Sequence, residues 1–284
     1  MYPYVGKYIA NLTLQQIKTL DCGGLRLHDF PLQLVKKGTK ISTLGEMFEF
    51  VKCADPEGTV QFNIESKLDP AYPNRTRSVE DFVQLQLAAF KASGVDLKRI
   101  TFQSFDWRSL IRMKQLNSEV LISALVDDTT IYDNQVDYPG SSSAALGFKA
   151  NLSTWLAGIE WEKFPGDTVG AKIAYAAKSI KADILSPVVQ AYSSPVTNPW
   201  QPGFIYFTNA SMVDTVHKLG MTIKPWTVDQ LDLVEYIVLT LGVDGVITDF
   251  PEIVHRWGVQ HGFKLAKKRD PKRVLKCLED HTKY

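Results

Sequence analysis

Short runs of apolar, often β-branched residues alternate along this chain with longer segments in which apolar residues recur every three or four positions. The short runs predict strands at about 60–64, 100–103, 120–125, 183–186, 221–226 and 245–248. The longer segments predict helices over 43–53, 78–93, 106–116, 170–181, 210–219 and 228–241. This alternation is typical of an α/β fold in which crossover helices connect parallel strands.

Several predicted helices carry start and stop signals. Ser78 and Thr227 each precede carboxylates in a first turn, where a hydroxyl caps free backbone N–H groups and the helix dipole favours negative charge. Gly94 and Gly220 stand where a left-handed residue ends a helix.

The last predicted strand stops at Thr248-Asp249-Phe250-Pro251, because Pro251 cannot donate a ladder hydrogen bond. In parallel sheets and barrels the carboxyl ends of the strands form the rim where chemistry takes place. Two interpretations stay open for Asp249, a functional carboxylate or a cap of the following helix.

A second strand carries a charged pair. The period of two places Asn63, Glu65 and Lys67 on one face of the segment 59–67. A glutamate can hold a divalent cation and a lysine can neutralise a phosphate oxygen, which suits a phosphate site. The alternative is an ion pair inside a barrel that only stabilises the fold.

Aromatic and amide side chains follow two further strands. Gln103 and Phe105 stand at a strand end where both would border one pocket, and Trp226 ends another strand directly after a proline. Trp226 is either a pocket wall or a core aromatic that closes the sheet. The segments 127–154 and 192–203 read as long loops on the same rim, and long loops of this kind are often functional.

Four segments in this order, NIESK at 63–67, TFQSFD at 101–106, KPWTV at 224–228 and VDGVITDFP at 243–251, resemble the glycerophosphodiester phosphodiesterase family. The resemblance extends from about Leu14 to about Trp257. It implies a TIM-type (β/α)8 barrel in which six β/α units are present, with the first two strands upstream of Met1. It also implies hydrolysis of a phosphodiester into an alcohol and a phosphomonoester such as glycerol 3-phosphate.

The resemblance also implies roles for individual residues. Glu65 would bind a divalent cation, Ca or Mg, and Lys67 would contact the phosphate as a catalytic residue. Trp226 would line the pocket for the glycerol moiety or the leaving alcohol. The full set of expected substrate-binding residues is Gln103, Phe105, Trp226 and Asp249.

Three motifs of the family, His-Arg-Gly, Glu-x-Asp and His-Asp, have no counterpart in this chain. The pair His28-Asp29 falls in a connection that varies in the family, so we expect no catalytic role for His28. A catalytically inactive homologue that binds phosphodiesters or a protein partner is therefore the alternative, and we expect these 284 residues alone to be inactive. An unrelated barrel acting on sugar phosphates would need a glycine-rich phosphate loop, which the segment after Trp226 does not provide.

Composition limits the classes of partner that this protein could bind. The apolar share of 45%, the charged share of 22% and the net charge of +1 are ordinary for a globular protein and argue against nucleic-acid binding. No apolar run approaches the ~18 residues of a membrane span. We expect a barrel over 1–260 and a basic tail over 261–284. The basic run 264–273 is expected to be a solvated helix end, with membrane-surface binding as the alternative.

Cysteines and glycosylation sequons bear on the compartment. Cys22, Cys53 and Cys277 allow one disulfide and leave one thiol, and their spacing decides no pairing. Four of the eight asparagines, at 11, 74, 151 and 209, open sequons, which favours a glycoprotein that is secreted or resides in the secretory lumen. No signal peptide is visible after Met1, and a cytosolic protein with unmodified sequons is the alternative.

Overall fold

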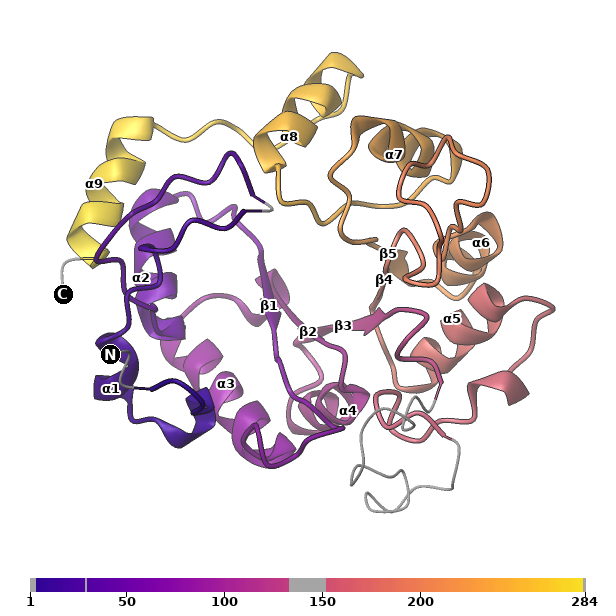
Figure 1. Cartoon of the computed structure of the whole chain (residues 1–284), viewed down its shortest axis with the longest axis horizontal. Helices are drawn as coiled ribbons and strands as arrows, with labels where there is room; N and C mark the ends of the chain where they lie inside the picture. Colours follow the sequence, from indigo (N-terminus) through magenta and orange to yellow (C-terminus); the bar gives the residue numbers. More distant parts are fainter. Residues whose placement is uncertain (1–3, 29, 133–151, 283–284) are drawn as a thin grey trace.

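The computed structural model describes residues 4–28, 30–132 and 152–282, and in this part of the chain parallel strands form one sheet. The strands lie toward the middle of the molecule, with the helices around them (Figure 1). They pair in sequence order: β1 (Phe62–Glu65), β2 (Ile100–Ser104), β3 (Leu121–Val126), β4 (Ile184–Pro187) and β5 (Thr222–Ile223). The predicted α/β class with a parallel sheet is confirmed.

All six predicted helices are present. The helices are α1 (Leu14–Lys18), α2 (Leu44–Ala54), α3 (Val79–Ser93), α4 (Trp107–Leu116), α5 (Val169–Ser179), α6 (Ala210–Lys218), α7 (Leu231–Glu235), α8 (Pro251–Gln260) and α9 (Pro271–Thr282). A π-helical turn (Tyr236–Thr240) extends α7, and short 3-10 turns cover Ile9–Asn11, Leu97–Arg99 and Trp161–Lys163.

Most helix ends follow the capping signals of the sequence. The Ser78 hydroxyl accepts a hydrogen bond from Asp81 N at the start of α3, and Gly94 ends that helix with a φ of 69°. Gly220, with a φ of 68°, follows α6 in the same conformation. The prediction for Thr227 is wrong, because α7 begins later, at Leu231.

The main core lies between the sheet and the helices outside it. Phe48 of α2, Phe90 of α3 and Phe102 of β2 are buried, with ring centroids 6.3 Å and 6.5 Å apart along the series. Trp107 is fully buried at the start of α4, and its indole N–H donates to Leu125 O at 2.9 Å. Burying each such side chain contributes about 1.5–3 kcal/mol, so this layer fixes the helices against the sheet.

The sixth predicted strand is not a strand in the described residues. Its segment does lie beside β5, because Asp244 N donates to Ile223 O at 3.1 Å and Ile247 N to Pro225 O at 2.9 Å. Pro225 has no N–H to return a bond to this segment. The ladder is therefore interrupted, and the chain from 244 to 247 is not a strand.

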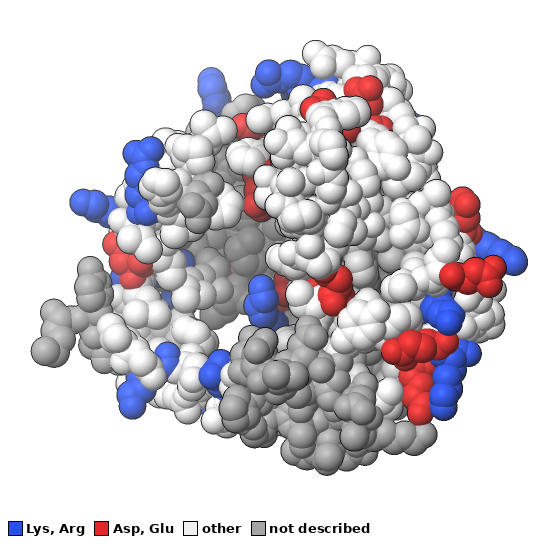
Figure 2. Space-filling model, turned by 45° about the vertical axis from the view of Figure 1, so that its right-hand side comes forward, with Lys and Arg blue, Asp and Glu red and all other residues white. Residues whose placement is uncertain are grey.

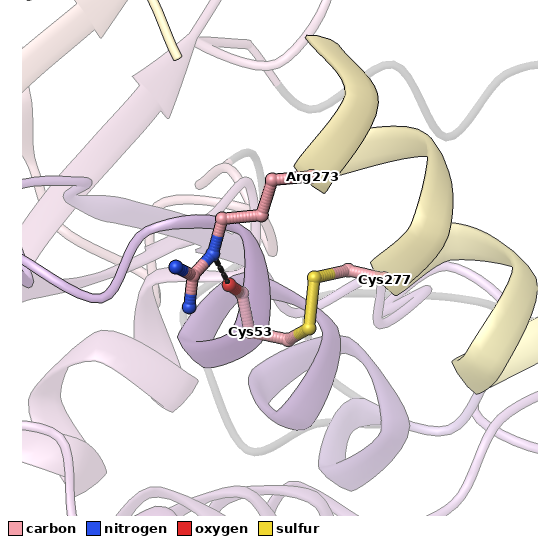
Figure 3. Close-up of a disulfide and its surroundings, with 3 residues drawn as sticks. All are labelled: Cys53, Arg273 and Cys277. Atoms are coloured by element: carbon pink, nitrogen blue, oxygen red, sulfur yellow. Dashed lines mark hydrogen bonds between the residues drawn. A yellow bond between two sulfur atoms is a disulfide. The ribbon is translucent and has the colours of Figure 1, made fainter. Parts of the chain in front are cut away.

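The end of the chain returns to its first half. Helix α9 lies beside α2 (Figure 1), and a disulfide joins Cys53 of α2 to Cys277 of α9, with Cα atoms 5.7 Å apart. Figure 3 shows the Arg273 guanidinium beside this bond, where its Nε donates to Cys53 O at 2.7 Å. Cys22 is a free, exposed thiol, so one disulfide and one thiol are present as the count allows.

A buried carboxylate strengthens this attachment. Asp55, 4% exposed, accepts hydrogen bonds from Thr59 N and Val60 N at 2.7 and 2.6 Å. Arg269 lies 2.8 Å from the same carboxylate and Arg99 4.0 Å from it. Burial alone would raise the pKa of Asp55, but the two backbone hydrogen bonds and the two arginines outweigh it and hold the pKa below its usual value.

We expect the disulfide to stabilise the fold, because it closes a loop of 224 residues in the unfolded chain. Replacing Cys53 and Cys277 by serine should lower the free energy of unfolding by about 2–4 kcal/mol, measured by urea denaturation. Cys22→Ser is the matched control and should leave the urea midpoint unchanged. Equal midpoints for the double variant and the wild type would contradict the expected contribution.

Asp55→Asn should lower the free energy of unfolding by about 3–5 kcal/mol at neutral pH, because it leaves Arg269 and Arg99 without their carboxylate. A carboxylate with a lowered folded-state pKa contributes stability that is present above its unfolded pKa and lost as the pH falls through its folded pKa. Wild type and variant should therefore converge in stability as the pH falls below the usual range of an aspartate. A difference that stays constant down to acidic pH would show that the charge plays no part.

Candidate active site

A chain of polar side chains crosses one face of the sheet. Gln103 of β2 is 5% exposed, and its Oε1 accepts from Asn63 Nδ2 of β1 at 3.1 Å and from Ser123 Oγ of β3 at 3.3 Å. Ser123 Oγ lies 2.8 Å from Ser186 Oγ of β4. Buried polar atoms are retained where they find partners, so this face is polar across four strands while the opposite face packs against helices.

Glu65 and Lys67 lie where β1 ends. The Lys67 Nζ is 3.6 Å from Glu65 Oε1, and the Lys67 side chain is 84% exposed. The backbone between them is fixed, because Ser66 N donates to Gln103 O at 2.7 Å. An exposed pair of this kind contributes at most about 1 kcal/mol, so the ammonium can turn to a ligand at little cost in stability.

A cavity of about 400 Å³ opens at this end of the sheet. Its lining combines charged, hydroxyl and aromatic side chains: Glu65, Ser66, Lys67, Leu68, Asp69, Arg75, Thr76, Phe105, Asp127, Thr129, Thr130 and Trp155. Figure 2 shows a hollow in the molecule with acidic and basic side chains at its edge. The cavity has the size and mixed polarity of a small-molecule site.

An aromatic cluster forms one wall of the site. The Phe105 ring meets the Trp226 ring edge to face at 5.3 Å and the Trp155 ring at 6.3 Å. The Trp226 Nε1 donates to Ser186 O at 2.8 Å, which fixes the indole. Phe105 and Trp155 line the cavity itself, whereas Trp226 supports Phe105 from the side.

Two aspartates after β3 hold the adjoining loops. Asp127 Oδ1 accepts from Thr129 N at 2.8 Å and from Thr130 N at 2.9 Å, which closes a tight turn on the cavity floor. Asp128 accepts from Tyr192 N and Ser193 N, each at 2.8 Å. Burial would raise the pKa of Asp128, but the hydrogen bonds from Ser193 and Tyr192 outweigh it and lower the pKa. Of the predicted rim loop 127–154, residues 133–151 lie outside the described residues.

Asp249 does not line the cavity that holds Glu65 and Lys67. Its backbone N donates to Asp229 Oδ1 at 2.9 Å. It borders a second cavity of about 450 Å³ between the N-terminal segment and α8, lined also by Leu27, Phe30, Leu32, Gln33, Phe250, Glu252 and Ile253. The structure thus places Glu65, Lys67 and Phe105 on the lining of one cavity. Gln103 lies in the row of hydrogen-bonded side chains on the same face of the sheet, and Asp249 lies at a different cavity.

The donor set does not fit a divalent cation. Ca²⁺ takes about 6–8 oxygen ligands and Mg²⁺ about six, whereas Glu65 faces Lys67, and the Oδ1 atom of Asp127 already accepts hydrogen bonds. Within the described ranges, no three His, Cys, Asp or Glu side chains form a group that could hold a metal ion. The cation site therefore stays a prediction, and we derive no chemical step from it.

Sequence reasoning missed several residues of this site. Ser123 and Ser186 interrupt apolar strands on the polar face, and the period of two could have placed both beside Gln103. Asp127, Trp155 and Arg75 had no such signal, because they come from loops whose path the pattern does not define.

These features define the protein as an α/β chain with a parallel sheet and a charged, aromatic-walled cavity at the carboxyl ends of its strands. Residues 4–253 match the glycerophosphoryl diester phosphodiesterase family, so the chain belongs to that family and is classed with the phosphoric diester hydrolases. No curated protein matched the chain.

Solved structures share the fold. A glycerophosphoryl diester phosphodiesterase, so described, from Silicibacter pomeroyi is 21% identical with a TM-score of 0.63, over 91% of this chain and 71% of that one. One from Agrobacterium tumefaciens is 16% identical with a TM-score of 0.56, over 89% and 74%. An Oleispira antarctica phosphodiesterase, solved with its product sn-glycerol-3-phosphate, is 15% identical with a TM-score of 0.52, over 86% and 69%.

The contribution of the Gln103 hydrogen bonds to stability can be measured without a substrate. Gln103→Leu removes the acceptor of Asn63 Nδ2 and Ser123 Oγ at nearly constant volume. Asn63 is exposed and can donate to water, whereas loss of the acceptor of the buried Ser123 hydroxyl costs about 1–3 kcal/mol. Urea denaturation should show a corresponding loss of stability. Gln115→Leu, on the exposed surface of α4, is the matched control and should change stability by less than about 0.5 kcal/mol. A Gln103→Leu protein as stable as its control would remove Gln103 from the determinants of the fold.

Proposed function

We propose that this chain acts on glycerophosphodiesters and releases an alcohol and glycerol 3-phosphate. The observation that carries the proposal is the exposed ammonium of Lys67, 3.6 Å from Glu65 at the mouth of a cavity with an aromatic wall. Membership of the phosphodiesterase family supports the reaction class. The proposed ligand is a small molecule, since the chain has no strong basic excess for nucleic acid.

Each lining group suits a part of such a substrate. Lys67 would neutralise a phosphoryl oxygen as negative charge develops on it when water attacks phosphorus and the bond to the leaving alcohol breaks. Arg75 lies on the same lining and adds a second positive charge. Phe105, with Trp155 and the supporting Trp226, offers apolar area to the glycerol or alcohol moiety. Gln103 would hold this arrangement in place through its hydrogen bonds to both neighbouring strands.

The finer assignments remain part of the proposal. The divalent cation that the family implies, Ca or Mg, with Glu65 as one ligand, stays a prediction, because the described residues supply too few further ligands for it. For Asp249 we keep the substrate-binding role as a prediction about the second cavity, and the division into a barrel over 1–260 and a tail over 261–284 likewise stays a prediction.

A secretory history also stays a prediction. Asn11 and Asn74 are exposed, as glycosylation requires, whereas the Asn209 side chain accepts from Met212 N at 3.1 Å as the cap of α6. Asn151 lies outside the described residues. No helix of the described chain is long and apolar enough to cross a membrane.

A second candidate is a protein that binds glycerophosphodiesters without cleaving them. The observation that favours it is the cavity lining, in which no histidine stands among the described residues to act as general acid or base. General acid–base catalysis typically contributes roughly 10²–10⁴-fold, so binding without turnover is the expected result if no other group supplies it.

Binding and hydrolysis should be measured separately on the same protein. Calorimetry with glycerophosphocholine gives the affinity, and release of glycerol 3-phosphate, with and without Ca²⁺ or Mg²⁺, gives the rate. Lys67→Met should weaken binding roughly tenfold or more, because a hydrogen bond to a charged group contributes about 1.5–3 kcal/mol. Lys178→Met, at an exposed position of α5, is the matched control and should change neither quantity.

Turnover that falls with Lys67→Met and not with Lys178→Met supports the hydrolase. Binding that depends on Lys67 with no product formed supports the second candidate. The absence of both binding and turnover would overturn the two together.

A further inference from the structure

Lys224 lies on the same polar face of the sheet as the predicted site, and it opens the KPWTV segment, in which the sequence predicts no role for it. The last registered pair of β4 and β5 is Leu185 with Ile223, so the next residues, Ser186 and Lys224, are neighbours across the two strands. Lys224 N donates to Leu185 O at 3.0 Å and Trp226 N to Pro187 O at 3.0 Å, which keeps the backbone extended through this segment. Lys224 and Trp226 are two residues apart and therefore share a face.

This register places Lys224 two residues before Trp226, on the same face of the sheet as the aromatic wall. Two residues of extended chain span roughly 6.6 Å, and Trp226 contacts Phe105, which lines the cavity. The neighbouring Ser186 is the last member of the row of hydrogen-bonded side chains formed by Gln103, Ser123 and Ser186. Lys224 therefore places a cation beside Ser186, at the β5 end of this row of hydrogen-bonded side chains.

Within the described part of the chain, the Lys224 ammonium forms no hydrogen bond and no ion pair. The side chain is partly buried, and its stem passes Gly245, where an added Cβ would lie 3.6 Å from Lys224 Cγ. Burial lowers the pKa of Lys224, and no charged group of the described residues contributes to that shift. A partly buried cation without a counter-charge costs free energy, which an anionic ligand would offset.

We propose that Lys224 is an anion-binding residue of the site, which holds a phosphate or phosphate ester below the aromatic wall formed by Phe105 and Trp226. The inference rests on the proposed function in taking the anion to be a phosphate ester. It assigns a third cation to the site, besides Lys67 and Arg75, directly after β5, the strand at the opposite end of the sheet from β1.

The test uses inorganic phosphate as the probe, with acetate as an anion of different shape. Phosphate affinity is measured by calorimetry on the wild type, Lys224→Met, Lys224→Arg and the exposed control Lys178→Met. Lys224→Met should weaken phosphate binding roughly tenfold to hundredfold, the ratio that corresponds to one hydrogen bond of a charged group. Lys224→Arg should keep most of the affinity, and Lys178→Met all of it. Acetate should bind more weakly than phosphate to the wild type.

A second measurement on the wild type does not depend on how the variants fold. Acylation of lysines by an activated acetate ester is followed by peptide mass spectrometry with and without phosphate. Phosphate should slow acylation of Lys224 at least several-fold and leave Lys178 unchanged. Equal acylation rates at Lys224, or equal phosphate affinity in wild type and a folded Lys224→Met, would overturn the inference.

The result separates this inference from the proposed hydrolysis. If phosphate binding requires Lys224 and the protein releases no glycerol 3-phosphate, the anion site is supported and the proposed hydrolysis is rejected. Hydrolysis of glycerophosphocholine with phosphate affinity unaffected by Lys224→Met supports the hydrolase and removes Lys224 from its site.

Discussion

The register of the first strands depends on a single buried oxygen. Gln103 Oε1 accepts from side chains of both adjacent strands, from Asn63 and from Ser123. A slip of one residue would turn Gln103 toward the helices and bring an apolar neighbour into its place. The buried amide thus fixes which face of the sheet meets the helices, with Phe102 on the packed side, and which face carries the polar groups.

The sequence defined the repeating part of the fold well, because that part is set by local pattern. The cores of β1 to β4 lie within about two residues of the predicted runs, and helices such as α3 begin and end at their predicted caps. The sixth strand was wrong because the pattern of 245–248 gives no information about its neighbour. That neighbour contains Pro225, which interrupts the pairing. Helix α9 was missed because the basic run 264–273 led to the prediction of a tail, although the apolar residues of the helix recur with helical spacing.

The site could be predicted in part. Glu65, Lys67 and Phe105 meet at one cavity because side chains at the carboxyl ends of neighbouring parallel strands converge there. The same reasoning did not extend to Asp249, which follows an irregular segment and faces the N-terminal loop instead. The KPWTV segment contains Lys224, but the pattern of a predicted strand does not show which groups a lysine side chain meets. Its isolation becomes visible once the surrounding chain is placed.

The disulfide between α2 and α9 turns most of the polypeptide into a closed ring. Cys53 and Cys277 are 224 residues apart, so β1 to β5 and the helices between them all lie within that ring. A protease that cuts any one exposed loop between the two cysteines would open the ring without separating the pieces. Under oxidising conditions the disulfide would keep the two fragments of the nicked protein joined, and they would part when the bond is reduced and the fold is denatured.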